Sequence, residues 1–384
     1  MMKIGIDLTS LLYGRGVSRY TSSLFTALSE EPDVKLFGYA SSHRGQKKLY
    51  QELKQLESTL SPSQQKVFQK NLTFQKFSPK LNWLFWHYLK INPIKKAIPK
   101  IDLFHSWDYL QPPDNDLPLV STIHDLAILK FPHIAHPEVL AHHRQSWKIL
   151  KRKNAHLIVV SQHTKDDVIN LLGFPEHHVH LVYEALPLDA ILPSEQLSKK
   201  NFLQLRQKYT LNKDYFLFVG NREPRKNLQR LIEAWWPLRE KIDLVLVGAK
   251  GWNEPKLKHP NLKILQHLDN YDLGLLYNFA QALTYPSLEE GFGLPILEAY
   301  AYRTPVVTSL YTATAEVAGE AGVLVDPYSI KSINQGLQTI LNESKLEKQA
   351  RQEKMNKQLH KFSWKKAAKA TVKVYQKALE DHHA

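Results

Sequence analysis

A chain of 384 residues is long for a single core and suits two domains, and its net charge of +14 at pH 7 makes it strongly basic. It contains no cysteine, which excludes a disulfide framework, a thiol nucleophile and a thiolate metal site. It also lacks an apolar run of about 18 residues and the apolar core of a signal peptide, so we expect a cytoplasmic protein without a transmembrane helix.

The first predicted strand, Lys3–Leu8, leads into a turn that contains Gly14 and Gly16. The helix predicted after this turn has apolar residues at positions 17, 20, 24, 25 and 28. A glycine-bearing turn between a strand and a helix can bind phosphate through its backbone amides. A tight turn that requires positive φ explains both glycines equally well. The dinucleotide fingerprint has a third glycine that is missing here, which disfavours NAD or FAD.

Residues 41–100, which we call the basic segment, carry eleven lysines and one arginine but only two acidic residues. Aromatic residues lie among these charges. One interpretation is a surface that meets an anionic membrane or a lipid-phosphate substrate, peripheral on the inner face of the membrane. The other is a solvated basic helix face, and in either case we expect Trp83 and Trp86 to pack in the core. No nucleic-acid-binding motif accompanies the charge, so we expect no nucleic acid partner.

A predicted strand over Leu119–His124 ends in an ionisable pair, His124 and Asp125. An imidazole at the carboxyl end of a strand can bond a hydroxyl group or move a proton. Most of the 18 histidines must be structural or exposed, and the position at the end of a strand favours His124 over the others. The acidic pair Asp114 and Asp116 lies in a proline-rich segment and is interpreted as a turn, so we assign no metal.

In the second half of the chain, a strand over Tyr215–Val219 precedes a loop with three cations, Arg222, Arg225 and Lys226. The carboxyl end of a strand is the side of an open α/β sheet where ligands bind. Arginine and lysine there can neutralise a diphosphate and stabilise it as it leaves. A solvated basic loop is the alternative. Asn227 is predicted to cap the helix that follows.

Two carboxylates, Glu290 and Glu298, lie on either side of a glycine-rich loop that follows the strand predicted at Ala282–Tyr285. The glycines let backbone amides approach a ligand, and Pro295 suits the start of a helix whose N-terminus favours negative charge. The loop can therefore bind phosphate while Glu298 accepts hydrogen bonds from hydroxyl groups. Such a site suits an anionic, polyhydroxylated ligand such as a nucleotide-sugar.

Short apolar strands alternate with longer amphipathic stretches along the chain, which predicts two parallel sheets covered by helices. We expect an N-terminal Rossmann-like domain over 1–190 and a second Rossmann-like domain over 191–362, facing a central cleft, with a hinge near Pro187–Ser194. The C-terminal helix is expected to return to the first domain, with one apolar face. The remaining predicted strands are Val34–Tyr39, Leu103–His105, Leu157–Val160, His180–Val182, Leu244–Val247, Leu262–Leu265, Val306–Thr308 and Val323–Val325.

The chain resembles the retaining glycosyltransferases of family 4, which have two Rossmann-like domains in the GT-B fold. The resemblance runs nearly from end to end, and the segment from Glu290 to Glu298 carries its most specific motif. The other matching segments are Gly14-Arg15-Gly16 with Arg19-Tyr20, Ile123-His124-Asp125-Leu126, Glu223-Pro224-Arg225-Lys226-Asn227, Thr304-Pro305-Val306-Val307, Ala321-Gly322, Asp326-Pro327 and Phe362-Ser363-Trp364.

The resemblance implies a metal-independent, retaining transferase without a cofactor, whose donor is a nucleotide-diphosphate sugar. Glu298 would bond the ribose and Glu290 the donor sugar. The loop residues that would offer backbone contacts are Gly291, Phe292, Gly293 and Leu294. Lys226 and an arginine would hold the diphosphate, with Gly16 closing on it from the first domain. His124 would contact the donor sugar near the reacting carbon.

Two departures from the family pattern stand out. An arginine that the family often has directly after the first strand of the second domain is Asn221 here, so Arg222 or Arg225 must take its place. A glycine common after the second acid is also missing, in a segment that reads Ala299 to Thr304.

We expect a hexosyltransferase, mannosyl-like in its donor, that acts on a glycan or lipid-linked glycan acceptor. The alternatives are a nucleotide-sugar epimerase or a phosphorylase of the same fold, or a catalytically inactive nucleotide-sugar-binding protein.

Overall fold

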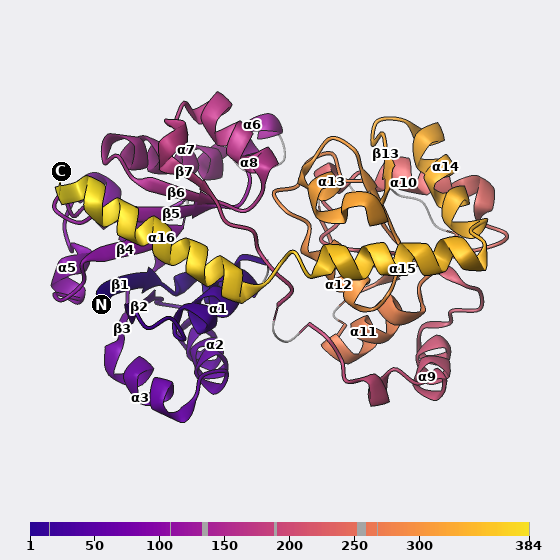
Figure 1. The fold of residues 1–384 in the computed structure, drawn as a ribbon, viewed down its shortest axis with the longest axis horizontal. Helices are drawn as coiled ribbons and strands as arrows, with labels where there is room; N and C mark the ends of the chain where they lie inside the picture. The colour runs from indigo at the N-terminus through magenta and orange to yellow at the C-terminus, as the bar shows by residue number, and fades with distance from the viewer. Residues whose placement is uncertain are drawn as a thin grey trace. The chain divides into compact units, whose positions relative to one another are not determined.

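A computed structural model describes residues 1–14, 16–107, 109–132, 137–187, 190–251, 259–266 and 268–383 (Figure 1). The chain divides into two compact units. The first unit combines residues 1–187 with residues 363–384, and the second contains residues 188–362. Arg15 of the glycine turn, and residues 188 and 189 of the expected hinge, lie outside the described residues.

The first unit is built on a parallel sheet, which has seven strands among the described residues. Their order is β3-β2-β1-β4-β5-β6-β7, so the chain reverses its direction of growth between β1 and β4. The strands are β1 (Met2–Asp7), β2 (Val34–Ser41), β3 (Leu72–Gln75), β4 (Leu103–Trp107), β5 (Leu119–Ile123), β6 (His156–Val159) and β7 (Val179–Leu181).

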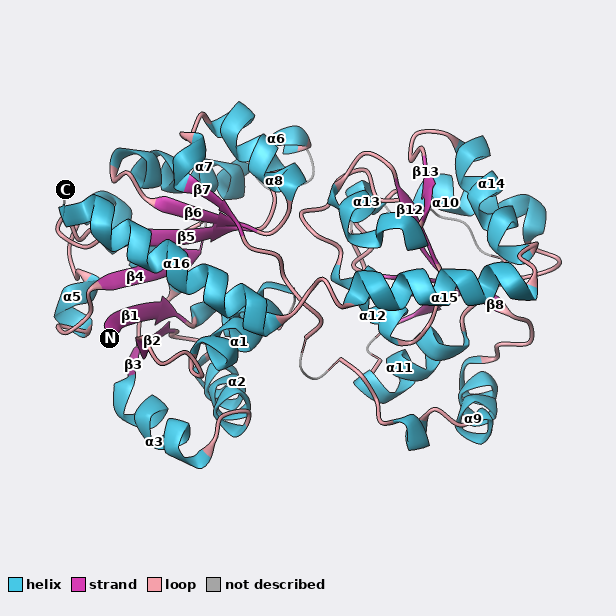
Figure 2. Ribbon diagram, in the orientation of Figure 1, coloured by secondary structure: helices cyan, strands magenta, loops and turns pink. Residues whose placement is uncertain are grey.

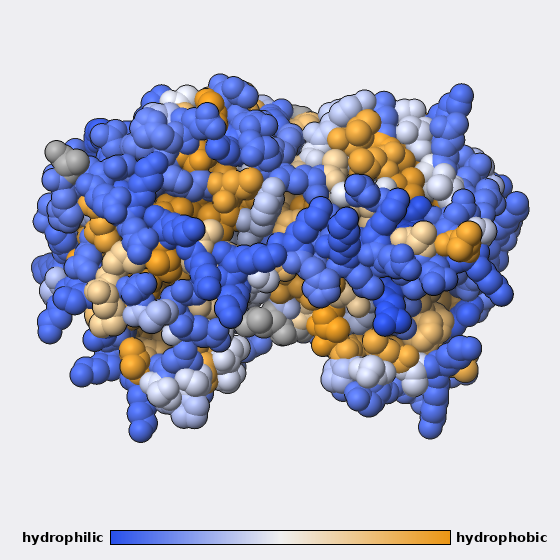
Figure 3. Space-filling model, viewed as in Figure 1, coloured by the Kyte–Doolittle hydropathy of each residue, from blue (hydrophilic) through white to orange (hydrophobic). Residues whose placement is uncertain are grey.

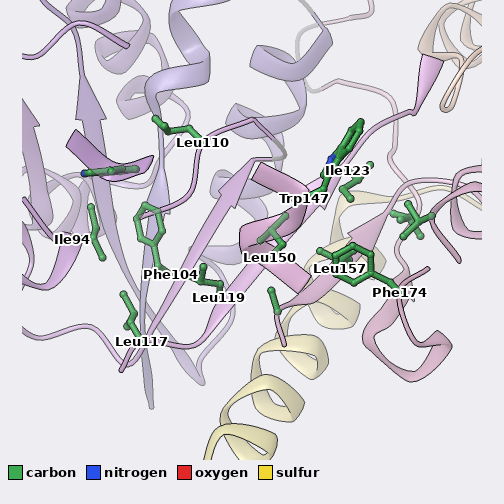
Figure 4. Packing of buried hydrophobic residues seen from close by; sticks show 14 of the residues in the cluster. Ile94, Phe104, Leu110, Leu117, Leu119, Ile123, Trp147, Leu150, Leu157 and Phe174 are labelled. Carbon is green, nitrogen blue, oxygen red and sulfur yellow. The ribbon is translucent and has the colours of Figure 1, made fainter. Parts of the chain in front are cut away.

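Helices cover both faces of this sheet (Figure 2). On one face, Phe104, Leu119 and Leu157 of the strands pack with Leu150 of a helix in an apolar cluster, part of which is drawn in Figure 4. The helices of the unit are α1 (Gly16–Leu28), α2 (Gln46–Ser58), α3 (Pro62–Asn71), α4 (Pro79–Trp83), α5 (Ile94–Ala97), α6 (Ala127–Lys130), α7 (Pro137–Arg152), α8 (Gln162–Asp167) and α16 (Trp364–His383).

Helix α16 lies against α1, β5 and β6 on the other face of the sheet, far from α1 in sequence (Figure 1). Its apolar residues recur at helical spacing, and Trp364, Ala368, Val372 and Tyr375 are all buried, as expected. The opposite side of the helix carries exposed lysines, and the face of the molecule in Figure 3 is mainly hydrophilic.

A buried histidine joins this helix to the sheet. The side chain of His105 on β4 points to the face opposite Phe104 and is fully buried. Its Nδ1 lies 2.7 Å from the Tyr375 hydroxyl, and its Nε2 lies 2.8 Å from Thr122 Oγ1. Burial, with a smaller contribution from the charge of His124, lowers the pKa of His105 to about 3. The neutral imidazole is therefore part of the packing that holds α16.

The second unit is also built on a parallel sheet, which has six strands among the described residues in the order β10-β9-β8-β11-β12-β13. The strands are β8 (Tyr215–Val219), β9 (Asp243–Val247), β10 (Leu262–Leu265), β11 (Ala282–Tyr285), β12 (Val306–Ser309) and β13 (Val323–Val325). The helices are α9 (Lys199–Tyr209), α10 (Leu228–Trp235), α11 (Asn270–Phe279), α12 (Leu294–Ala301), α13 (Ala313–Ala318), α14 (Ile330–Leu341) and α15 (Lys345–Leu359).

The two parallel sheets and every strand expected from the sequence are present. Strand β3 was not expected. Its four residues, Leu72 to Gln75, do alternate between apolar and polar side chains, but the run is short and all four residues are half-buried, so the signal is weak. Trp86 packs in the core as expected, whereas Trp83 is only half-buried beside it. None of the described helices is long and apolar enough to cross a membrane.

One capping prediction was wrong. Asn227 stands just before α10, as expected, but its side chain accepts no bond from the helix amides. Its Nδ2 instead donates to the carbonyl oxygens of Pro286 and Pro327, at 2.9 and 2.6 Å, and so ties together the loops after β11 and β13. Its backbone lies in the left-handed region, at a φ of 61°, which asparagine tolerates better than most residues.

Candidate functional site

The order of strands in the second sheet brings two loops to one place. Strand β8 lies between β9 and β11, so the chain reverses its direction of growth between β8 and β11. In an open parallel sheet, ligands bind outside the carboxyl ends of the strands at such a reversal. The loop after β8 carries the three predicted cations, and the loop after β11 carries Glu290. Both predicted motifs therefore lie at the position where this architecture places a ligand.

The loop after β8 is packed backbone to backbone against the loop after β9. A Cβ added to Gly248 would lie 2.0 Å from the carbonyl oxygen of Gly220, and one on Gly251 would lie 1.7 Å from that of Arg222, so both positions require glycine. Arg222 is buried, and its Nη1 donates to the Gly248 carbonyl at 2.6 Å. The guanidinium of Arg222 thus holds the two loops together.

Lys226, Arg225 and Glu290 form one buried network. The ammonium of Lys226 donates to Glu290 Oε1 and, at 2.5 Å, to the hydroxyl of Tyr285, the last residue of β11. Arg225 donates from Nη1 to Glu290 Oε2 at 3.0 Å and from Nε to Glu223 Oε2 at 3.1 Å. Lys226 and Glu290 are each only 6% exposed, so water screens this cluster weakly.

The charges of this network determine the protonation of Glu290. Burial by itself would raise the pKa of Glu290, but the charges of Lys226 and Arg225 outweigh burial and lower it to about 2. Burial and the charge of Arg225 lower the pKa of Lys226, while Glu290 opposes that change. Glu290 is therefore an ionised carboxylate held between two cations.

The loop from Gly291 to Leu294 leads from this network into α12. Gly293 stands at the start of the helix with a φ of 112°, a conformation that favours glycine. The side chain of Phe292 is buried, and its ring meets that of Phe362 edge to face at 5.5 Å. Leu294 is the first helical residue and is half-buried. A φ that only glycine adopts easily thus sets the direction of the helix.

Glu298 lies on α12 and is 5% exposed. Its Oε2 accepts a hydrogen bond of 2.8 Å from the hydroxyl of Tyr277 on α11. The ring of Tyr277 stacks on that of Tyr302 at 5.7 Å. The carboxylate is therefore held in a defined direction by an aromatic pair.

In the first unit, His124 follows β5 directly. Its Nδ1 lies 3.0 Å from Oε1 of Glu184, a buried residue beyond β7. A carboxylate only accepts, so Nδ1 carries a proton in this pair. The ring also meets Tyr20 of α1 edge to face at 4.7 Å. The carboxylate and the tyrosine ring together fix both the orientation and the tautomer of the imidazole.

The backbone requires glycine at only one of the two glycine positions after β1. Gly14 has a φ of 59°, so the tight-turn interpretation accounts for it. Gly16 begins α1, has no positive φ, and a Cβ added there would meet nothing within 4 Å. Neither backbone strain nor packing requires glycine at Gly16.

The structure brings together Arg225, Lys226 and Glu290. Arg222 instead bonds the loop after β9, through the carbonyl oxygen of Gly248. Glu298 bonds Tyr277 and is not part of this network. Three partners of these residues were not expected: Tyr285, which bonds Lys226, Tyr277, which bonds Glu298, and Glu184, which lies beside His124. Tyr285 could have been found as the last residue of its strand. Tyr277 and Glu184 lie on elements whose sequences carry no signal for the pairing.

Two family models match the chain. Residues 14–190 match glycosyltransferase family 4, and residues 201–359 match the glycosyl transferases of group 1. The chain is 28% identical to O-antigen chain mannosyltransferase B of Escherichia coli over 381 residues, which covers 94% of this chain and 95% of that protein. It is 26% identical to O-antigen chain mannosyltransferase RfbU of Salmonella typhimurium over 227 residues, which covers 57% of this chain and 60% of that protein.

Solved structures share the fold. A glycosyltransferase from Rickettsia africae superposes with a TM-score of 0.70 at 16% identity, over 98% of both chains. Anabaena HepE, solved in complex with UDP and glucose, superposes with a TM-score of 0.68 at 16% identity, over 98% of this chain and all of that one. The chain therefore belongs to glycosyltransferase family 4 and is a hexosyltransferase with the GT-B fold.

Proposed function

We propose that the protein transfers a hexosyl group, mannosyl-like, from a nucleotide-diphosphate sugar to a glycan or lipid-linked glycan with retention of anomeric configuration. The network of Lys226, Arg225 and Glu290 at the strand reversal of the second sheet is the observation that carries this proposal. The similarity to O-antigen mannosyltransferases supports the choice of sugar and acceptor.

Lys226 and Arg225 are suited to a diphosphate. The carboxylates of Glu290 and Glu223 offset the charges of these two cations. A bound diphosphate would share these cations, and Arg225 can bind two phosphate oxygens at once. When the bond between the anomeric carbon and the diphosphate breaks, the leaving oxygen gains negative charge. Cations already fixed in a buried site stabilise that charge without reorganising.

Glu290 would then act on the sugar. Its carboxylate accepts hydrogen bonds from hydroxyl groups of the hexose and favours positive charge on the anomeric carbon. The acceptor oxygen attacks from the face that the diphosphate leaves, and its proton passes to the departing phosphate oxygen. In this scheme no protein group forms a covalent bond to the sugar.

Two further carboxylates, Glu298 and Glu184, would orient the ribose of the donor and the imidazole of His124. Glu298, oriented by Tyr277, would accept from the ribose hydroxyls of the donor. Glu184 would hold His124 so that the imidazole can contact a hydroxyl of the donor sugar. Gly16 would leave room for the diphosphate, since no packing or strain explains its missing side chain. These roles rest on the resemblance and on the contacts described above.

The protein would meet its acceptor at the surface of an anionic membrane, to which the basic segment would bind. Along the basic segment, the π-helical turn Leu84–Leu89 leaves Tyr88 and Leu89 more than half exposed. Leu81 and Ile91 on either side of the turn are also exposed, and lysines at 76, 80 and 90 lie among them in sequence. Exposed apolar side chains among lysines are typical of a surface that binds anionic lipid.

The site is tested with a thermal-shift panel of nucleoside-diphosphate hexoses, followed by transfer assays on a lipid-linked glycan. A donor far above its dissociation constant should stabilise the protein by about 3 kcal/mol. Lys226→Ala and Glu290→Gln should lower the transfer rate at least about a hundredfold, because each removes charge stabilisation from the transition state.

Lys208→Ala is the matched control, because it breaks a lysine–carboxylate pair with Asp272 at the surface of the same unit. It should leave transfer unchanged. Full transfer rates in the Lys226 and Glu290 variants would overturn the site assignment. Conversion of the donor without any acceptor would favour an epimerase. A bound pyridoxal phosphate, seen by its absorption, would favour a phosphorylase. Donor binding without turnover on any acceptor would favour an inactive binding protein.

A further inference from the structure

A cluster of histidines lies in the first unit, where the last turns of α16 meet the strands β6 and β7. His156 is the first residue of β6, His178 immediately precedes β7, and Asp381 lies on α16. One ligand atom from each of these three residues lies within 4.8 Å of the other two. Two neighbouring strands and the last helix thus bring two imidazoles and a carboxylate together.

His156 is the buried member of the cluster, at 2% exposed. Its Nδ1 lies 2.9 Å from Nε2 of His180 on β7, which satisfies that side of the ring. Its Nε2 faces Oδ2 of Asp381 at 3.1 Å. Among the described residues, however, none forms an aligned hydrogen bond with this Nε2. A buried ring nitrogen therefore points toward a carboxylate without the hydrogen bond that burial normally demands.

We propose that His156, His178 and Asp381 bind a divalent transition metal ion, with Zn²⁺ as the best match. Imidazole nitrogen and carboxylate oxygen are both ligands of Zn²⁺, at about 2.0–2.2 Å. Two such ligands at a tetrahedral angle lie about 3.3 Å apart. The distance of 3.1 Å between His156 Nε2 and Asp381 Oδ2 matches this spacing. A water molecule completes the four ligands.

A histidine that binds a metal ion commonly forms a hydrogen bond through its other ring nitrogen, and His180 is placed to form that bond with His156. If the Nδ1 proton of His156 is donated to His180, the lone pair of Nε2 is directed at the metal ion. His178 stacks on His156 with ring centroids 4.5 Å apart and is only half-buried, so its ring can turn to bring a nitrogen to the ion.

The site would attach the end of α16 to the edge of the first sheet. Lys377 on the same helix already donates to the carbonyl oxygen of His177 at 3.0 Å. A metal ion between Asp381 and the two histidines would add a second link one turn further along the helix. Its role is structural and is independent of the donor chemistry proposed for the second unit.

The test uses the full chain without an affinity tag, freed of metal with a chelator. Calorimetry with Zn²⁺ at pH 7.5 should give one site per chain, and Zn²⁺ should raise the melting temperature. Co²⁺ should give the visible absorption of a tetrahedral ion. Asp381→Asn and His178→Gln should each weaken Zn²⁺ binding at least about tenfold, because each removes one ligand.

His43→Gln, an exposed histidine near β2, is the matched control and should bind Zn²⁺ like the wild-type chain. Both ligand variants alter exposed or half-buried side chains, and circular dichroism checks that they fold. The absence of Zn²⁺ binding, or binding that neither ligand variant weakens, would overturn the proposal. The cluster would then be held only by the hydrogen bond between His156 and His180 and by the contact of His156 with the Asp381 carboxylate.

Discussion

Lys226 and Glu290 form a buried ion pair in the second unit. Both could be predicted as site residues from the sequence. Both follow a predicted strand at its carboxyl end, and parallel strands bring those ends to one edge of the sheet. Their partners were harder to find. Tyr277 meets Glu298 from another helix, and Glu184 meets His124 across 60 residues of sequence. Such pairs depend on how helices and loops pack, which no local pattern records.

Arg303, two residues after the end of α12, has a strained backbone whose cost can be measured. Arg303 is exposed and has a φ of 59°, in the left-handed region that disfavours residues with a Cβ. It lies in the segment where the family's glycine is missing. Arg303→Gly should raise the free energy of unfolding by about 0.5–1 kcal/mol, because relief of strain exceeds the added entropy of the unfolded chain.

Urea denaturation of the wild-type and variant chains measures this difference. Arg303→Ala keeps the strained conformation and removes only the long side chain, so it should change stability little. Equal stability of the glycine and alanine variants would contradict the expected strain.

Helix α16 was expected as an amphipathic element that returns to the first domain, and its buried face is the predicted one. Its apolar residues recur at helical spacing over many turns, which makes such a helix easy to recognise. Strand β3 has only four residues and no such repetition, so its place at the edge of the sheet depends on pairing with β2.

The contact of α16 with His105 predicts a dependence of stability on pH. The pKa of His105 is about 3 in the folded protein against 6.5 for the free side chain. The unfolded chain therefore binds a proton first as the pH falls, and stability is lost between pH 6.5 and pH 3. The loss should reach about 1.4 kcal/mol per pH unit, since one proton is involved.

Urea denaturation from pH 7 to pH 4.5 isolates this effect by comparing the wild-type chain with His105→Gln. The glutamine variant should be less stable at pH 7, and its deficit should shrink as the pH falls. His43→Gln, at an exposed position, should keep the dependence of the wild-type chain. Parallel pH profiles for the wild-type and His105→Gln chains would contradict a neutral buried histidine.

At the scale of the whole molecule, the alternation of strands and helices was enough to predict two parallel sheets. The order of strands within each sheet follows the Rossmann pattern that the sequence resemblance implied. The net charge of +14 bears on the partners of the chain, because a strongly basic protein is attracted to anionic surfaces.

The proposed membrane surface predicts a strong effect of salt. Binding of the full chain to phosphatidylglycerol vesicles should weaken as salt rises from 50 to 300 mM, because salt screens exposed charges. A Lys76→Ala, Lys80→Ala double variant should bind about thirtyfold more weakly, at about 1 kcal/mol for each lysine. Co-sedimentation with the vesicles measures both effects.

Lys208→Ala, which removes a lysine from the second unit, should bind these vesicles like the wild-type chain. Vesicles of phosphatidylcholine alone should bind weakly at every salt concentration. Equal binding by the double variant and the wild-type chain would place the attraction elsewhere on the molecule.

The first unit is made of two separate pieces of chain, residues 1–187 and 363–384. During synthesis, the ribosome completes the whole second unit before it makes the helix that covers β5 and β6. The second unit is continuous in sequence and can finish folding first, although it is made later than most of the first. Until Tyr375 emerges, the nascent chain exposes the face of β4 that carries His105. A premature stop near residue 362 would therefore damage the unit that lies upstream of it.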